Sequence, residues 1–156
     1  MPPAPSAGIL LYRRAPELEI LAGHMGGPFW ARKDARAWSL PKGEFAAGEE
    51  PLAAALREFG EELGVPAPEA PYVELGTFRY SSGKTVTVFA AEAPGFEAGD
   101  AERGTFELEW PPRSGRLRRF PEIDEVAWLP LPAAREKLVA GQVAALDALE
   151  AMLAGA

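Results

Sequence analysis

Apolar residues recur along this chain in two spacings, one typical of strands and one typical of helices. Short apolar runs bounded by turn residues predict strands at 8–13, 18–24, 38–40, 72–80, 85–91, 106–110 and 126–129. Apolar spacings of three and four residues predict a helix that ends at Gly64 and helices at 131–139 and 142–153. The proline-rich residues 1–7 are expected to form a loose leader. The order predicts one α/β domain over residues 1–156.

The helix that ends at Gly64 has an apolar side and an acidic side. At about 100° per residue, one set of side chains should face the core: Leu52, Leu56, Phe59 and Leu63. Another set gathers on a different side: Glu58, Glu61 and Glu62. Like charges at this spacing repel, and the last turns of a helix disfavour negative charge. The pattern therefore predicts a nearby cation, and hard divalent ions take oxygen ligands of this kind.

The residues around these acids follow one complete pattern. Residues 43–65 match Gx5Ex7REUxEExGU, where U is apolar, at every fixed position. A solvated acidic face is the ordinary explanation for three glutamates alone, but it does not account for the whole pattern. This segment resembles the Nudix box, and the chain resembles the Nudix hydrolases. The resemblance implies an α/β/α sandwich with a mixed β-sheet.

The resemblance also implies a reaction. Nudix enzymes hydrolyse a nucleoside diphosphate linked to another moiety, with bound Mg²⁺ or Mn²⁺. Such ions neutralise a polyphosphate and acidify a water molecule, and carboxylates supply ligands and a base. The implied catalytic and metal-site residues are Glu58, Glu61 and Glu62, with Glu58 favoured as the base.

Other positions of the box are implied to support that site. Arg57 is expected to pair with Glu49 and to orient the site from one shell out. Gly43 is expected to allow a tight loop, and the Lys42 carbonyl is a candidate extra metal ligand. Gly64 is expected to cap the helix.

A further acid outside the box is expected near the final strand, as in many Nudix enzymes. Glu122 is favoured for this metal-binding role because it lies just ahead of the strand at 126–129, at a distance from Trp128 that resembles related enzymes. Glu125 is the second choice, and a solvated loop acid is the alternative for both.

The flank Trp38-Ser39-Leu40-Pro41-Lys42-Gly43 bears on the substrate. Its PKG sequence resembles the branch that contains asymmetric diadenosine tetraphosphate hydrolases, where the Lys42 ammonium would meet a phosphate. The other candidate substrate-binding residues are Lys84 and His24 for phosphate, and Tyr80, Trp30 and Phe78 for a base. The alternatives are another nucleotide (an oxidised nucleoside triphosphate, a nucleotide sugar or ADP-ribose) and a nucleotide-sensing Nudix domain without turnover.

Composition limits the binding partners, the chemistry and the cellular location that the chain can have. The net charge of −7 argues against binding to extended nucleic acid, although a metal ion can still bring a small anionic nucleotide to the site. The chain has no cysteine, which excludes disulfides and thiol chemistry. No apolar run is long enough to cross a membrane and no signal peptide is recognisable, so a cytoplasmic monomer or homodimer is expected. Residues 106–116, FELEWPPRSGR, suggest no role.

Overall fold

A mixed β-sheet organises the part of the chain that the computed structural model describes, residues 4–14, 16–99 and 102–155. Its strands are β1 (Ser6–Arg13), β2 (Glu19–Met25), β3 (Trp38–Ser39), β4 (Lys42–Glu44), β5 (Val73–Arg79), β6 (Thr85–Glu92) and β9 (Ile123–Pro130). The strand order is β3-β2-β1-β6-β5, with β4 paired to β1 and β9 paired to β2. β1 and β6 run parallel, and the other pairs are antiparallel.

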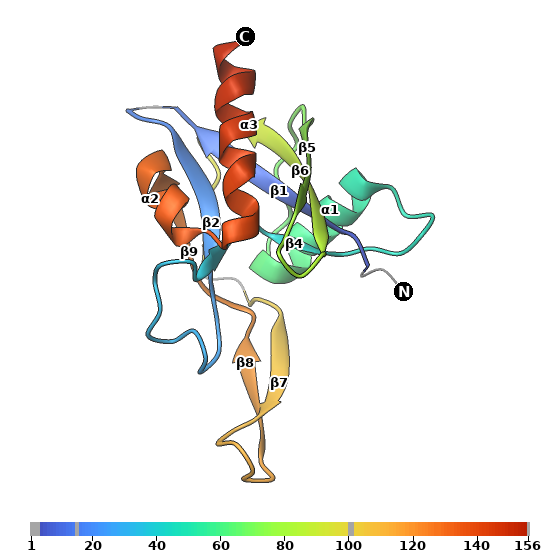
Figure 1. The fold of residues 1–156 in the computed structure, drawn as a ribbon, viewed down its shortest axis with the longest axis vertical. Coiled ribbons are helices and arrows are strands. Elements are labelled where there is room, and N and C mark those ends of the chain that lie inside the picture. Colours follow the sequence, from blue (N-terminus) through green and yellow to red (C-terminus); the bar gives the residue numbers. More distant parts are fainter. Residues whose placement is uncertain (1–3, 15, 100–101, 156) are drawn as a thin grey trace.

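Helices cover both faces of this sheet, as Figure 1 shows. The helices are α1 (Pro51–Leu63), α2 (Leu131–Lys137) and α3 (Val143–Ala154), and a short 3₁₀ helix (Ala140–Gln142) precedes α3. Successive strand residues point to opposite faces. Accordingly, Ile9 of β1 packs in the core under α1, whereas its neighbour Leu10 packs in the core under α3. The α/β/α sandwich with a mixed sheet is therefore confirmed. Among the described residues, no helix has the length and apolarity needed to cross a bilayer.

The helix of the acidic pattern begins and ends as the sequence predicts. Pro51 occupies its first turn, where a missing N–H costs nothing. Gly64 follows its last turn with φ of 76°, and its N–H bonds to the Gly60 carbonyl oxygen. That left-handed conformation explains the glycine at this position.

The structure corrects three expectations about the strands. Ser6 and Ala7 do not belong to a loose leader: both are buried in β1 and pair with both β4 and β6. β4 was not predicted, because Lys42, Gly43 and Glu44 contain no apolar alternation. A further strand, β8 (Leu117–Pro121), was not predicted either, because the two adjacent arginines of LRRFP interrupt any apolar alternation. Residues 1–3 of the leader lie outside the described residues.

β8 pairs with β7 (Thr105–Glu109) in a separate two-stranded hairpin that points away from the sheet (Figure 1). An isolated hairpin is marginal in water, and this one is attached at its base. The N–H of Gly104 donates to the Glu61 carbonyl oxygen (3.0 Å), and the N–H of Glu122 donates to the Gly104 carbonyl oxygen (2.9 Å). The hairpin's base therefore joins the end of α1 to the start of β9.

Candidate functional site

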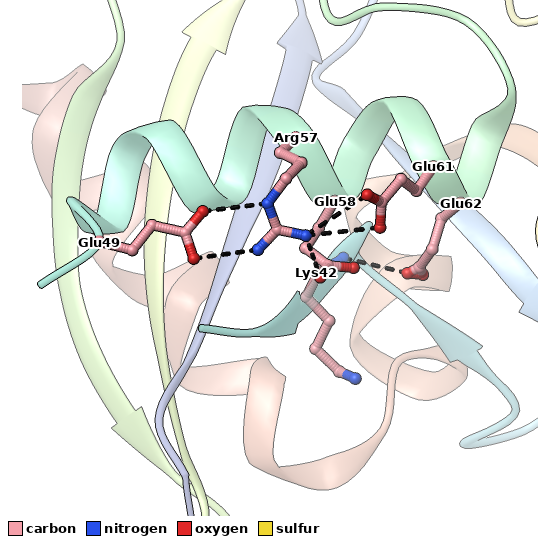
Figure 2. Close-up of polar contacts among 6 residues, drawn as sticks. All are labelled: Lys42, Glu49, Arg57, Glu58, Glu61 and Glu62. Carbon is pink, nitrogen blue, oxygen red and sulfur yellow. Dashed lines mark hydrogen bonds and ion pairs between the residues drawn. The ribbon is translucent and has the colours of Figure 1, made fainter. Parts of the chain in front are cut away.

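Arg57 lies at the centre of the acidic cluster on α1 (Figure 2). Its guanidinium donates to both carboxylate oxygens of Glu49, at 3.0 and 3.1 Å, so the ion pair expected from the sequence is present. The same group donates to Glu58 Oε1 at 2.8 Å and approaches Glu61 at 3.4 Å. Its hydrogen bonds hold the pKa of Glu49 below the ordinary value. Arg57 thus offsets the repulsion between the acids of this helix and fixes the Glu58 carboxylate.

Glu62 is almost fully buried, with 8% of its surface exposed. One of its carboxylate oxygens accepts a hydrogen bond from the Lys42 N–H at 3.2 Å (Figure 2). Burial raises the pKa of Glu62 to about 7; the Lys42 N–H opposes this effect, and the negative charges of Glu122 and Glu58 add to it. Glu62 is therefore a carboxyl group that changes its charge near neutral pH, within electrostatic reach of Glu58 and Glu122.

This raised pKa predicts that stabilisation by Mg²⁺ depends on pH. Between pH 4.5 and about pH 7, Glu62 has lost its proton in the unfolded chain but keeps it in the folded chain. The contribution of Glu62 to stability is therefore lost as pH rises through this interval, by about 1.4 kcal/mol per unit. Mg²⁺ requires the carboxylate, so the Mg²⁺-induced rise in unfolding temperature should be small at the acid end and reach a plateau above about pH 7. A rise of equal size across the interval would contradict this prediction, and Glu62→Gln should weaken the dependence.

Glu122 lies beside this cluster, and Glu125 does not. A Cβ atom built on Gly104 would lie 3.7 Å from Glu122 Oε2 and 3.0 Å from the Glu61 carbonyl oxygen, which places Glu122 next to the end of α1. Glu125 instead lines a different cavity, around His24. This placement favours Glu122 as the further acid, and its role as a metal ligand stays a prediction.

The donor set fits a hard divalent cation. Glu58, Glu61, Glu62 and Glu122 offer carboxylate oxygens, and the buried Glu62 is destabilised by the neighbouring negative charges. As the side chains stand, no three acidic or histidine groups among the described residues converge on one point. Arg57 holds Glu58 and Glu61 on one side, and the Lys42 N–H holds Glu62 on the other.

Gly43 is needed for close approach rather than for a turn. It lies in β4 with an ordinary φ, so the tight loop expected from the sequence is not the reason for a glycine here. A Cβ atom at this position would lie 2.1 Å from both Cδ and Oε2 of Glu58. The absence of a side chain therefore makes room for the Glu58 carboxylate against the β4 backbone.

A cavity of about 520 Å³ adjoins the acidic cluster at Lys42. We call it the Tyr80 cavity; it is lined mainly by Met25, Ser39, Lys42, Arg79, Tyr80 and Gly141. Burial raises the pKa of Tyr80, and the negative charge of Glu62 contributes to the same shift, so the cavity lies within electrostatic reach of the acids. Of the candidate substrate-binding residues, Lys42 and Tyr80 line this cavity.

The remaining candidates lie elsewhere. Lys84 is exposed in the turn between β5 and β6. Trp30 packs against the core under α3, with the Lys33 ammonium 5.3 Å from its ring. Phe78 packs against the same core. A substrate-binding role for any of these residues stays a prediction. No sequence pattern marked Arg79, Ser39 and Gly141 as residues of one cavity, because they meet only in the folded chain.

His24 links two segments of the chain instead of facing the Tyr80 cavity. Its Nδ1 lies 2.8 Å from Asp124 Oδ1, and its Nε2 lies 2.6 Å from the Lys33 carbonyl oxygen. Both partners are acceptors, so the two hydrogen bonds form together only when both ring nitrogens carry a proton, and this favours the charged ring.

We expect His24 to titrate above its ordinary pKa of 6.5. Burial alone would lower this pKa, but the Lys33 carbonyl and the Asp124 carboxylate stabilise the charged ring and raise it. The stabilisation is complete below 6.5 and is lost as pH rises through the folded-state pKa. NMR can follow the ring directly, because the chain has one histidine. Asp124→Asn should lower the midpoint, and a wild-type midpoint at or below 6.5 would show that these contacts do not hold in solution.

Comparison with known proteins relates the chain to one family by sequence and to that family's fold by structure. The family model described as "NUDIX domain" matches residues 2–149. The chain is 32% identical over 137 residues to an 8-oxo-(d)GTP phosphatase of Mycolicibacterium smegmatis (85% of this chain, 37% of that protein). It is 42% identical over 57 residues to an RNA pyrophosphohydrolase of Methylococcus capsulatus (36% of this chain, 28% of that protein). Among solved structures, a C. elegans Ap4A hydrolase binary complex has a TM-score of 0.67 at 23% identity, covering 97% of this chain and 99% of that one.

The curated relatives are longer than the matched region. The chain spans from 23% to 41% of the length of the curated relatives it matches. The structural similarity, at its low identity, supports the fold.

Proposed function

Since the chain belongs to the Nudix hydrolase family, we propose that it is a metal-dependent pyrophosphohydrolase. It cleaves a phosphoanhydride bond in a nucleoside diphosphate derivative, and the substrate class we favour is the dinucleoside polyphosphates, with diadenosine tetraphosphate as the type member. The observation that supports this most is the position of the Tyr80 cavity. Lys42 both lines the cavity and donates its N–H to Glu62, so a nucleoside in the cavity lies next to the acidic cluster.

The residues divide into those that hold a cation and those that hold the substrate. Mg²⁺ or Mn²⁺ would be held by Glu58, Glu61, Glu62, Glu122 and the Lys42 carbonyl oxygen. A bound ion supplies neutralisation of the phosphate charge and makes water more acidic. Glu58 takes the proton of the attacking water. Arg57 keeps the Glu58 carboxylate in place, because its guanidinium is itself fixed by two hydrogen bonds to Glu49.

Lys42 and Arg79 supply positive charge at the cavity, where the phosphates of a bound nucleotide would leave it. A compact ammonium and a planar guanidinium both suit phosphate oxygens. A polyphosphate chain can then run from the cavity to the acids of α1.

A second candidate function has its own support. The cavity has the size of a nucleoside site, and a single nucleoside triphosphate fills it as well as one half of a dinucleotide does. The 8-oxo-(d)GTP phosphatase relative favours an oxidised nucleoside triphosphate as that substrate.

A panel of nucleotides incubated with Mg²⁺, with products separated by chromatography, tests the proposal. The panel contains diadenosine tetraphosphate, 8-oxo-dGTP, ADP-ribose, a nucleotide sugar and a 5′-triphosphorylated RNA. We expect ATP and AMP from diadenosine tetraphosphate, and no products when EDTA replaces Mg²⁺. Faster hydrolysis of another nucleotide in the panel would show that the proposed substrate class is wrong, while the proposed phosphoanhydride hydrolysis would still hold. Tight binding with no turnover of any member would instead identify a sensor and refute the enzymatic proposal.

A further inference from the structure

Gln142 is a fully buried polar side chain behind the Tyr80 cavity. Its amide joins three parts of the fold. Its Oε1 accepts a hydrogen bond from the Leu40 N–H at 2.9 Å. Its Nε2 donates to the hydroxyl oxygens of Ser39 and Tyr80, at 3.0 Å each. Both of those residues line the cavity, whereas Gln142 does not.

The orientation of this amide is fixed by the Leu40 N–H. A backbone N–H can only donate, so the amide oxygen must face it. The reverse orientation would set an NH₂ group against a buried N–H and leave both without a partner, which is costly. The NH₂ group therefore faces Ser39 and Tyr80, and both hydroxyl oxygens act as acceptors toward it.

The two hydroxyl groups differ in where their own hydrogen goes. The Ser39 hydroxyl donates to the Leu40 carbonyl oxygen at 2.8 Å. For Tyr80, the part of the chain that the structure describes contains no acceptor that receives its hydrogen, since Gln142 Nε2 is a donor. A tyrosine hydroxyl has a single hydrogen. Because Tyr80 lines the cavity, this hydrogen is available to an occupant.

The Tyr80 ring is held in place as well. A Cβ atom at Gly141 would lie 1.8 Å from Tyr80 Cδ1 and 2.5 Å from Tyr80 Cε1, so the ring lies directly on the Gly141 backbone. Lys42 and Arg79, the charged residues of the lining, can also only donate. These three side chains therefore offer donors to the occupant.

We propose that Gln142 fixes Tyr80 as a hydrogen-bond donor, so that the cavity selects a nucleotide whose base presents an acceptor atom to the Tyr80 hydroxyl. The inference rests on the proposed function only in taking the occupant to be a nucleotide. Met25, Val139 and Ala140 give the lining apolar surface that suits a base. Gln142 touches no occupant and is a positioning residue.

Binding of AMP, measured by calorimetry, tests this donor role without turnover, because AMP contains no phosphoanhydride bond. The ligands are AMP and three analogues in which ring nitrogen N1, N3 or N7 is replaced by C–H. The proteins are wild type, Tyr80→Phe and Tyr72→Phe. Tyr72 is a matched control, because its hydroxyl donates to the Pro68 carbonyl oxygen at 2.6 Å, away from the cavity.

We expect Tyr80→Phe to weaken AMP binding by roughly 3- to 10-fold, the effect of one neutral hydrogen bond. One analogue should bind the wild type more weakly than AMP does, by the same factor, and should bind Tyr80→Phe as well as AMP does. This non-additivity indicates that the Tyr80 hydroxyl contacts the replaced ring nitrogen directly. Tyr72→Phe should bind AMP as wild type does. Failure of AMP to bind, or analogue losses that are all unchanged by Tyr80→Phe, would overturn the donor role.

Gln142→Leu tests the positioning role. In this variant the Tyr80 hydroxyl remains but its hydrogen is no longer directed, so the dependence on the ring nitrogen should become weaker while the circular dichroism spectrum is retained. If the folded variant depends on the ring nitrogen as strongly as wild type does, Gln142 does not position the Tyr80 hydroxyl. If Gln142→Leu does not fold, the wild-type and Tyr80→Phe series still decides the donor role. Absence of hydrolysis in the nucleotide panel would not affect the donor role of Tyr80, which AMP binding tests. Conversely, absence of coupling between Tyr80 and a ring nitrogen would not affect the proposed hydrolysis.

Discussion

Glu58→Gln and Glu62→Gln should each lower turnover by at least about 100-fold, within the range that a base or a charge-stabilising group contributes. Each change removes a negative charge while keeping the shape of the side chain. Gln at position 62 can still accept the hydrogen bond from the Lys42 N–H. Without metal, Glu62→Gln also removes a buried group that is costly to ionise, so its unfolding temperature should equal or exceed that of wild type. Steady-state rates with Mg²⁺ and thermal unfolding measure both effects.

Glu50→Gln is the matched control for these variants. Glu50 directly precedes α1, is exposed and makes no side-chain capping bond, so its replacement changes the same charge without touching the cluster. We expect wild-type rates from it. Near wild-type rates from either Glu58→Gln or Glu62→Gln would refute the site assignment.

Gly43→Ala should also lower turnover by about 100-fold, because displacing a reacting group by about 1 Å has an effect of this size. The added methyl group would lie 2.1 Å from Glu58 Oε2. The β4 backbone is held by pairing with β1, so the Glu58 carboxylate must move instead. The unfolding temperature should change little, because the moving atoms are the end of a flexible side chain.

A double variant separates this cause from general damage. If Gly43→Ala acts through Glu58, combining it with Glu58→Gln should lower turnover no further than Glu58→Gln alone. Gly95→Ala is the control, since Gly95 has an ordinary φ and no atom lies within 4 Å of its added Cβ. Additive losses in the double variant would show that Gly43 acts independently of Glu58.

The parts of the site that could be predicted are those that a local repeat specifies. Helical periodicity predicted that the acids of α1 lie near one another, and Arg57 reaches Glu49 over eight residues within the same segment. Local spacing also explains why Gly64 was correctly assigned to the helix end.

Long-range contacts could not be predicted in this way. Gln142 meets Ser39 across 103 positions and Tyr80 across 62, and no sequence period relates them. His24 and Asp124, 100 positions apart, are adjacent because β2 pairs with β9. The strands that the sequence did not predict, β4 and β8, lack apolar alternation and owe their conformation to pairing with β1 and β7. Tertiary pairing overrides weak strand propensity at such positions.

The roles of Arg79 and Gly43 also could not be predicted from the sequence. Arg79 is the last residue of β5 and is exposed by the alternation of the strand, yet it lines the Tyr80 cavity because the strand ends there. For Gly43, the box indicated that a glycine is needed but not why. The reason depends on the distance between β4 and Glu58, which only the folded chain provides.

The most direct measurement is a crystal structure with Mn²⁺ and a diadenosine tetraphosphate analogue whose bridging oxygens are replaced by methylene groups. We predict anomalous density within about 2.3 Å of carboxylate oxygens of Glu58 and Glu62, with the analogue's phosphates beside it and one adenine in the Tyr80 cavity. Mn²⁺ density elsewhere, with Glu58 and Glu61 still on Arg57 and Glu62 still on the Lys42 N–H, would contradict the account.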